Sequence, residues 1–255
     1  MNISNLSFAL LASAAMVACG GGGGDTTPTA SVPTAEGVYG GQLTGNTTST
    51  AFELLVLENG EFWSIYGTQF GNSFGVAGFV QGSGTSSTGS FTSSNGKDFG
   101  FAPAVAGTTT AAYNATAKTI TGTTTSGTSS VAFSGGPIPG SLYNYDTAAS
   151  LTTIAGSWST TSLTGEGIAL NVAANGSYTA VGTSGCNFSG TITPRASGKN
   201  VFNVGITFGA APCALAGQSG TGIALAYPIT GGLTQLLVAA TDSTRTYGSA
   251  VFGTR

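Results

Sequence analysis

The sequence predicts an all-β protein that consists of two tandem small antiparallel β-barrels of the up-and-down type, each with about eight strands. Glycine accounts for 42 of the 255 residues, and only 6% of the residues are charged. Short apolar and threonine-rich segments recur at intervals of roughly 8–12 residues, which is typical of barrels and sandwiches. A pattern centred on an Asn-Gly pair also occurs once in each half. The alternative is one larger β-sandwich that spans both halves.

Residues 1–18 have the features of an export signal. Their apolar stretch is shorter than the about 20 residues that a transmembrane helix needs. The order Val17, Ala18, Cys19 and Gly20 resembles the signal of bacterial lipoproteins. This resemblance implies that Cys19 is the lipidation site, carrying acyl chains such as palmitate. The alternative is an ordinary cleaved signal, which would leave Cys19 as a free thiol.

Residues 19–35 are expected to form a flexible tether that begins at the lipidated Cys19. A glycine tract is followed by residues rich in Thr, Pro, Ser and Ala, and such a composition cannot bury a core. Stable anchoring needs more than one acyl chain, and bacterial lipoprotein processing supplies several. Because glycine follows Cys19, the resemblance implies a lipid-anchored protein of the outer membrane, either surface-exposed or facing the periplasm.

Residues 36–135 are expected to form the N-terminal barrel. An apolar segment and an aromatic segment lie on either side of the pair at residues 59–60. Asn-Gly between two strands predicts a hairpin with a type I′ turn, which needs positive φ at both positions. Another Asn-Gly pair, at residues 95–96, is likewise expected to form a polar hairpin turn.

Residues 136–150 interrupt the strand pattern with glycine and proline, and we expect them to be a linker. Tyr143 and Tyr145 in this segment are expected to be exposed and could join a surface between the domains. Residues 151–255 then repeat the pattern, with Asn-Gly at residues 175–176, and are expected to form the C-terminal barrel. Each half is long enough for its own core, and closure removes exposed strand edges.

The cysteines predict one structural disulfide. Once Cys19 is assigned to the lipid, Cys186 and Cys213 remain as a pair in an oxidising, exported setting. They are 27 positions apart, and bridging them would stabilise the fold by about 3.5 kcal/mol through the entropy of the unfolded chain. The chain contains no histidine, so a zinc site or a Cys–His dyad is not expected.

The remaining motifs favour turns over chemistry. Residues 71–75 match the G-x-S-x-G string, but that motif needs a following helix and a histidine base. Residues 94–97 match S-x-x-K within a predicted hairpin turn. Glu58 and Glu61 flank a hairpin end, where solvated charges are more common than paired catalytic carboxylates. We therefore expect no enzyme activity, no catalytic residues, no metal and no cofactor.

Aromatic side chains in the first half are the main candidates for ligand binding. Alternation along a strand sends Phe62 and Trp63 to opposite faces, and most of these aromatics are expected to lie in the core. Trp63, Tyr66 and Phe70 could line a barrel mouth that binds a sugar, a lipid or a partner protein. The net charge of −3 and six scattered basic residues argue against nucleic acid as a partner.

Two short segments carry a family resemblance. Residues 156–158 (Gly-Ser-Trp) are similar to the Gly-x-Trp start of lipocalin-like barrels, and residues 248–255 look like the closing strand of barrels in surface lipoproteins of the transferrin-binding-protein-B type. The resemblance implies a β-barrel outer-membrane lipoprotein and no particular ligand. We expect a non-enzymatic binding or interaction module of the cell envelope, attached to the membrane by its lipid, with an unknown protein or small-molecule partner. A carrier of a small apolar ligand and a structural envelope protein are the alternatives.

Overall fold

The computed structural model describes residues 33–255 of the chain. The expected signal, most of the tether and the lipidation site at Cys19 lie outside the described residues. Within residues 33–255, no helix is both long enough and apolar enough to cross a membrane.

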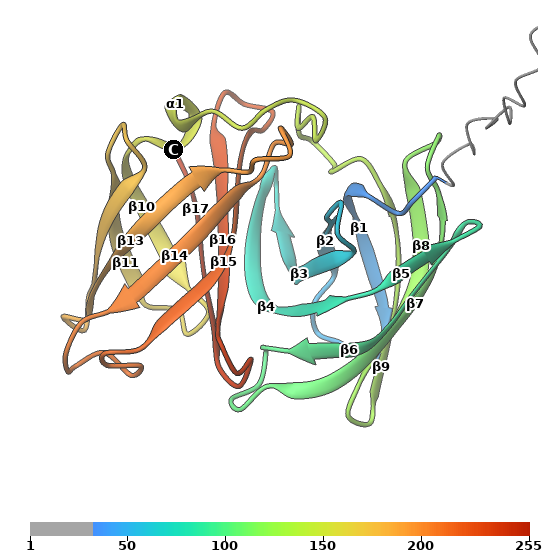
Figure 1. Cartoon of the computed structure of the whole chain (residues 1–255), viewed down its shortest axis with the longest axis horizontal. Coiled ribbons are helices and arrows are strands. Elements are labelled where there is room, and N and C mark those ends of the chain that lie inside the picture. The colour runs from blue at the N-terminus through green and yellow to red at the C-terminus, as the bar shows by residue number, and fades with distance from the viewer. Residues whose placement is uncertain (1–32) are drawn as a thin grey trace, which may run out of the picture. The chain divides into compact units, whose positions relative to one another are not determined.

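The first barrel is antiparallel throughout (Figure 1). Its strands are β1 (Gly37–Gly45), β2 (Ala51–Val56), β3 (Glu61–Phe70), β4 (Ser73–Ser83), β6 (Ser90–Asp98), β7 (Val105–Asn114), β8 (Thr119–Ser126) and β9 (Ser129–Gly136), with the short β5 (Thr85–Ser87) paired to β6. Strand β1 pairs with β9, and the sheet closes where β4 pairs with β6. Only two residue pairs make this seam, Val80 with Asp98 and Gln81 with Lys97.

The second barrel follows a short helix, α1 (Leu151–Ile154), and its strands are arranged in sequence order. They are β10 (Gly156–Ser162), β11 (Gly167–Val172), β12 (Ser177–Gly182), β13 (Asn187–Pro194), β14 (Phe202–Phe208), β15 (Ser219–Pro228), β16 (Thr234–Asp242) and β17 (Gly248–Thr254). Pairing of β10 with β17 closes it. The prediction of two closed eight-stranded antiparallel barrels is confirmed, and the single larger sandwich is not what the chain forms.

The two Asn-Gly hairpins are present, but their turn type differs from the prediction. In the first hairpin, the Gly60 amide donates to the Leu57 carbonyl at 2.9 Å, and the Gly176 amide bonds the Ala173 carbonyl at the same distance in the second. Only the glycines have positive φ, +80° and +83°. A type I′ turn would also need positive φ at the asparagine, so that part of the prediction is wrong. Both loops are instead one residue longer than the two-residue loop of a type I′ hairpin, and the two loops have the same hydrogen-bond pattern.

The Asn-Gly pair at residues 95–96 does not form a hairpin turn. It lies within β6, at a bulge where the register of the β6–β7 pairing shifts. The Asn95 side chain holds the bulge against β4 by accepting from the Ser83 amide at 2.8 Å and donating to the Ser83 hydroxyl at 2.7 Å. The sequence alone does not separate these two uses of Asn-Gly, because both need a local break in a regular strand.

Three apolar clusters hold the fold together. One fills part of the first barrel and includes Tyr39, Phe52, Phe62, Phe91 and Phe133, and another fills the second barrel around Trp158, Leu170, Ile192, Phe202 and Leu236. The third, which we call the shared core, combines outward-facing residues of both barrels, among them Leu55, Trp63, Ile65, Phe79, Leu225, Tyr227 and Leu237. As predicted from strand alternation, Phe62 and Trp63 belong to different cores.

The two linker tyrosines contribute to the shared core, so the expectation that they are exposed is wrong. Tyr145 is only 7% exposed, and Tyr143 is half-buried with its ring 5.4 Å from that of Tyr227. They are buried because the segment after β9 packs against the second barrel, where Ser141 forms a β-bridge with Ile229.

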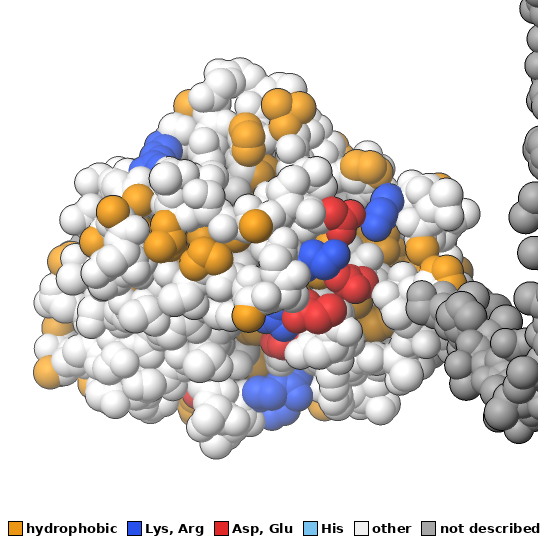
Figure 2. All heavy atoms as spheres, turned by 45° about the horizontal axis from the view of Figure 1, so that its top comes forward, with side chains coloured by type: hydrophobic (Ala, Val, Ile, Leu, Met, Phe, Trp, Pro, Cys, Tyr) orange, Lys and Arg blue, Asp and Glu red, His pale blue; other side chains and the backbone are white. Residues whose placement is uncertain are grey.

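The charged side chains are concentrated where the first barrel, the linker and the second barrel meet. Arg195 binds Glu58 at 2.9 Å, and Lys199 binds Glu36 at 3.3 Å and Asp146 at 2.9 Å. Figure 2 shows charged side chains gathered mainly in one area of the face drawn, on a surface that is otherwise largely uncharged. Such partly exposed pairs contribute roughly 0–1 kcal/mol each, so the apolar shared core is the stronger link.

Candidate functional site

A cavity of about 530 Å³ lies at one end of the first barrel. The β1–β2 loop, the β8–β9 turn and the loop after β6 surround it, and inward-facing residues of β3, β8 and β9 form its walls. Phe101 stands at its rim and is 53% exposed, whereas Ser126 and Phe133 in its wall are buried.

Two features of the sequence explain why this end of the barrel is hollow. The inward positions near the cavity carry small or polar residues such as Gly45, Thr124 and Ser126, while the other end is filled by aromatic rings such as Phe62 and Phe91. The β4–β6 seam also ends here: after the bond from the Phe99 amide to the Phe79 carbonyl, the strands separate. The cavity therefore lies where the inward side chains are small and the pairing between β4 and β6 has ended.

Asp98 and Tyr66 form the polar centre of the cavity wall. The Tyr66 hydroxyl donates to Asp98 Oδ1 at 2.6 Å, and the Gly100 amide donates to the same oxygen at 2.9 Å. Burial and the neighbouring carboxylate raise the pKa of Tyr66 well above its usual value, so the phenol remains a donor. A side chain at Gly78 or Gly100 would overlap with the phenol oxygen, so the absence of one at both positions makes room for this bond.

The rest of the lining is neutral and amphipathic. Hydroxyl groups come from residues such as Ser64, Thr124 and Ser126, and apolar groups come from residues such as Leu43, Val80, Val131 and Phe133. Among the described residues that line the cavity, Asp98 is the one carboxylate, and none is Lys or Arg. The site can therefore offer hydrogen bonds, apolar contact and one negative charge.

The structure does not bring the three predicted ligand-binding aromatics together. Tyr66 lines the cavity. Trp63 points to the other side of β3, is 2% exposed in the shared core and stacks on Phe79 with ring centres 5.6 Å apart. Phe70, at the end of β3, is 67% exposed and lines a separate groove of about 460 Å³ next to Phe252 of β17. Of the three, Tyr66 alone belongs to the cavity.

The interior of the second barrel is filled. Its cavity measures about 30 Å³ and is lined by Tyr178, Ile192 and Val204 among others. A space of this size holds about two water molecules and no organic ligand. A ligand-sized space is therefore found in the first barrel and not in the described interior of the second.

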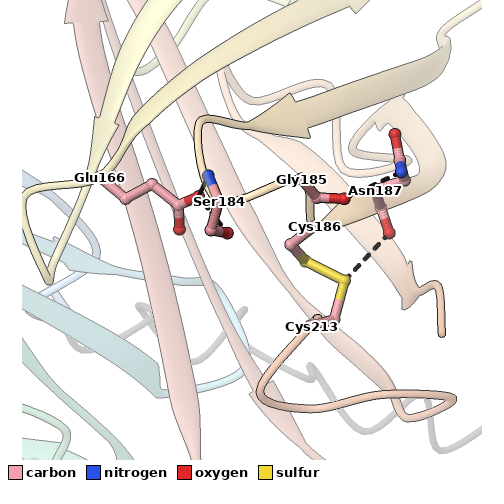
Figure 3. The surroundings of a disulfide bond; sticks show 6 residues. All are labelled: Glu166, Ser184, Gly185, Cys186, Asn187 and Cys213. Atoms are coloured by element: carbon pink, nitrogen blue, oxygen red, sulfur yellow. Dashed lines mark hydrogen bonds between the residues drawn. A yellow bond between two sulfur atoms is a disulfide. The ribbon is translucent and has the colours of Figure 1, made fainter. Parts of the chain in front are cut away.

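Cys186 and Cys213 form the predicted disulfide (Figure 3). The bond joins the β12–β13 turn to the loop between β14 and β15, with the Cα atoms 4.5 Å apart. Nearby, Glu166 accepts from the Ser184 amide and hydroxyl, which lowers the pKa of its carboxyl group. These contacts are structural and belong to the second barrel.

The sequence analysis did not single out two acidic residues that the structure shows to be buried, Asp98 in the cavity wall and Glu53 in the shared core. Glu53 lies on β2 at 4% exposure, where its Oε1 accepts from the Tyr227 hydroxyl at 2.5 Å and its Oε2 is buried without a partner among the described residues. Burial raises the pKa of Glu53 to about 7. Its position within an apolar strand was the available signal. Asp98 has no such signal, because it follows a polar segment.

In the part of the chain that the structure describes, no group of three or more acidic or cysteine side chains is placed to hold a metal ion.

Comparison with protein-family models gives no match, and neither does comparison with curated protein sequences. Among solved structures, the chain is similar to a protein of unknown function of the DUF3598 family from Nostoc punctiforme. The identity is 10% and the TM-score is 0.26, over 86% of this chain and 94% of the other. At so low a TM-score the likeness carries no argument about function.

Proposed function

We propose that the protein is a non-enzymatic binding module of the bacterial cell envelope, and that its first barrel holds a small amphipathic molecule in the cavity beside Tyr66 and Asp98. The observation that carries this proposal is the cavity of about 530 Å³ in one of two otherwise similar barrels. Small-molecule sites usually measure roughly 300–1,000 Å³ and combine apolar walls with a few polar groups.

The chemistry of the lining supports binding without a reaction. Tyr66 and Asp98 are the ionisable side chains among the described lining residues, and they are hydrogen-bonded to each other. The chain has no histidine that could act as a base beside them. The second barrel, with its filled interior, supports the first through the shared core.

The envelope location is proposed from the sequence. The order from Val17 to Gly20 resembles a lipoprotein signal, and two small barrels fit surface lipoproteins of the transferrin-binding-protein-B type. On this proposal Cys19 anchors the protein in the outer membrane. Cys19→Ala is expected to move the protein from the membrane fraction to the soluble fraction, whereas a Cys186→Ser and Cys213→Ser variant stays in the membrane fraction. Recovery of the Cys19→Ala variant with membranes would contradict the anchor.

Binding in the cavity can be tested with a neutral fluorescent probe, N-phenyl-1-naphthylamine, and the full-length protein. Val131→Trp on β9 fills the cavity and is expected to abolish saturable probe binding. Ala132→Trp places the same ring on the exposed outer face of the same strand and is expected to leave binding unchanged. Absence of saturable binding to the unmodified protein, or equal binding by both variants, would contradict the proposed function.

A further inference from the structure

Asp98 faces the interior of the first barrel. Its Cα partner across the seam is Val80, which belongs to the interior cluster, whereas its neighbour Phe99 belongs to the shared core outside the barrel. Asp98 is 7% exposed and lines the cavity. Its carboxylate is therefore withdrawn from bulk solvent and directed into the proposed binding site.

No cation of the described chain neutralises this carboxylate. The ion pairs of residues 33–255 join Arg195 to Glu58 and Lys199 to Glu36 and Asp146. Lys97, the nearest basic residue in sequence, lies on the opposite face of β6 and donates to the carbonyls of Thr244 and Arg245 at 3.3 and 2.7 Å. A buried charge is destabilising unless a cation or hydrogen bonds compensate for it.

The hydrogen bonds use only one of the two carboxylate oxygens. Tyr66 and Gly100 both donate to Oδ1, and within the described residues Oδ2 accepts no hydrogen bond. Unlike Glu53 Oε2, which is fully buried and has no partner among residues 33–255, Asp98 Oδ2 is not fully buried. Because Asp98 lines the cavity, its second oxygen is accessible to a ligand.

We infer that the ligand of the first barrel is an organic amine, a protonated amino group attached to an apolar body. The ammonium group binds Asp98 Oδ2, and the hydroxyls of Ser64 and Ser126 are among the acceptors in the same cavity for its remaining N–H groups. The apolar body contacts the wall that contains Val131 and Phe133. This inference rests on the proposed function, because it concerns the same cavity.

The test compares three ligands of one length, octylamine, octan-1-ol and octanoate, as competitors of N-phenyl-1-naphthylamine on the full-length protein. Octylamine is expected to displace the probe at a concentration about tenfold lower than octan-1-ol, which corresponds to one charge-assisted contact. Octanoate is expected to be the weakest competitor because it would face the Asp98 carboxylate.

Asp98→Asn keeps an acceptor oxygen for Tyr66 and Gly100 but removes the charge. In this variant octylamine is expected to compete no better than octan-1-ol. Asp146→Asn removes the same charge from an exposed position outside the cavity and is expected to retain the preference for the amine. Thermal unfolding of both variants checks that they are folded.

The outcomes separate the inference from the proposed function. Equal competition by octylamine and octan-1-ol on the unmodified protein overturns the amine inference, while saturable probe binding still supports a ligand cavity. A preference for octylamine that survives Asp98→Asn also overturns the inference. Should Asp98→Asn not fold, the comparison of the three ligands on the unmodified protein decides the question.

Discussion

Eight strands close each barrel and both barrels have the same Asn-Gly hairpin, yet one is hollow and the other is filled. The first contains a cavity of about 530 Å³, and the second contains about 30 Å³. The number of residue pairs at the seam does not explain the difference, because it is two in each barrel. The inward side chains do: Thr124 and Ser126 line the first cavity where Tyr178 and Ile192 fill the second. The volume of the inward side chains, together with the place where the β4–β6 pairing ends, therefore explains why only the first barrel contains a ligand-sized cavity among the described interiors.

The second difference concerns stability. The second barrel has a disulfide and a continuous apolar interior, whereas a cavity occupies part of the interior of the first barrel. The shared core, with Leu55, Trp63 and Leu225, attaches the first barrel to the better-packed second one. Contact with the second barrel buries apolar side chains on the outer face of the first barrel. This burial stabilises the first barrel and offsets part of the burial that its interior lacks because of the cavity.

Matched truncations test the difference in packing most strongly. Ile192→Ala removes a fully buried side chain from the filled barrel and is expected to lower the free energy of unfolding by about 4 kcal/mol. Leu43→Ala removes a half-buried side chain from the cavity wall. It is expected to lower the free energy of unfolding by about 1 kcal/mol, because the Leu43 side chain already borders the cavity and loses few packing contacts. Urea unfolding of both variants measures the difference, and equal costs would contradict it.

Loss of the disulfide tests how much the bond contributes to stability and whether the cavity of the first barrel is independent of it. Replacement of Cys186 and Cys213 by serine is expected to lower the free energy of unfolding by about 3.5 kcal/mol, since the bond closes a loop across 27 positions. Probe binding in the first barrel without denaturant is expected to persist, because the disulfide is remote from the cavity. An unchanged urea midpoint would show that the bond contributes little.

The buried carboxylate of Glu53 predicts a pH dependence for the shared core. Burial raises its pKa from 4.5 to about 7, so the folded protein holds a proton that the unfolded chain releases between these values. Its contribution to stability is complete below about pH 4.5 and is lost as the pH rises through 7, a change of about 3 kcal/mol. The facing Tyr143 and Tyr227 stay protonated in this range, because their pKa values are raised above the usual one.

Glu53→Gln removes the titrating group and leaves every other carboxyl group in place. The difference between the variant and the unmodified protein therefore isolates the contribution of Glu53. Unfolding free energies at about pH 4 and pH 8 are expected to differ by about 3 kcal/mol more in the unmodified protein than in the variant. The same pH dependence in both proteins would show that folding does not raise the pKa of Glu53.

The smallest effect concerns the position of Tyr66. Gly100→Ala places a methyl group against the phenol oxygen and is expected to break its bond to Asp98, with a loss of about tenfold in probe or amine affinity. Tyr66→Phe removes the same bond without steric conflict and is expected to match it. Competition titrations of the two variants measure these affinities. Unchanged affinity in both variants would show that the hydrogen bond from Tyr66 does not contribute to ligand binding.

The sequence predicted the regular features of the molecule and missed the irregular ones. Strand alternation correctly separated Phe62 from Trp63, and the cysteine pair correctly indicated a disulfide. It could not show that the pair at residues 95–96 forms a bulge, because a bulge depends on the facing strand. It could not identify Asp98 either, because a single aspartate becomes informative only when closure turns it inward.

The linker tyrosines were missed for a related reason. Glycine and proline around them indicated exposure, and burial came from contact with the second barrel, which is distant in sequence. The candidate ligand site was therefore predictable only in part: Tyr66 was named, while Trp63 and Phe70 lie elsewhere.

An amide NMR titration of the full-length protein with octylamine tests most directly whether the first barrel is the one that binds a ligand. Saturable shifts are expected at residues lining the first cavity, such as Ser64, Gly100 and Val131, and none are expected at Ile192 and Val204 inside the second barrel. Saturable shifts confined to the second barrel or to the groove at Phe70, or none at all, would contradict the assignment of ligand binding to the first barrel.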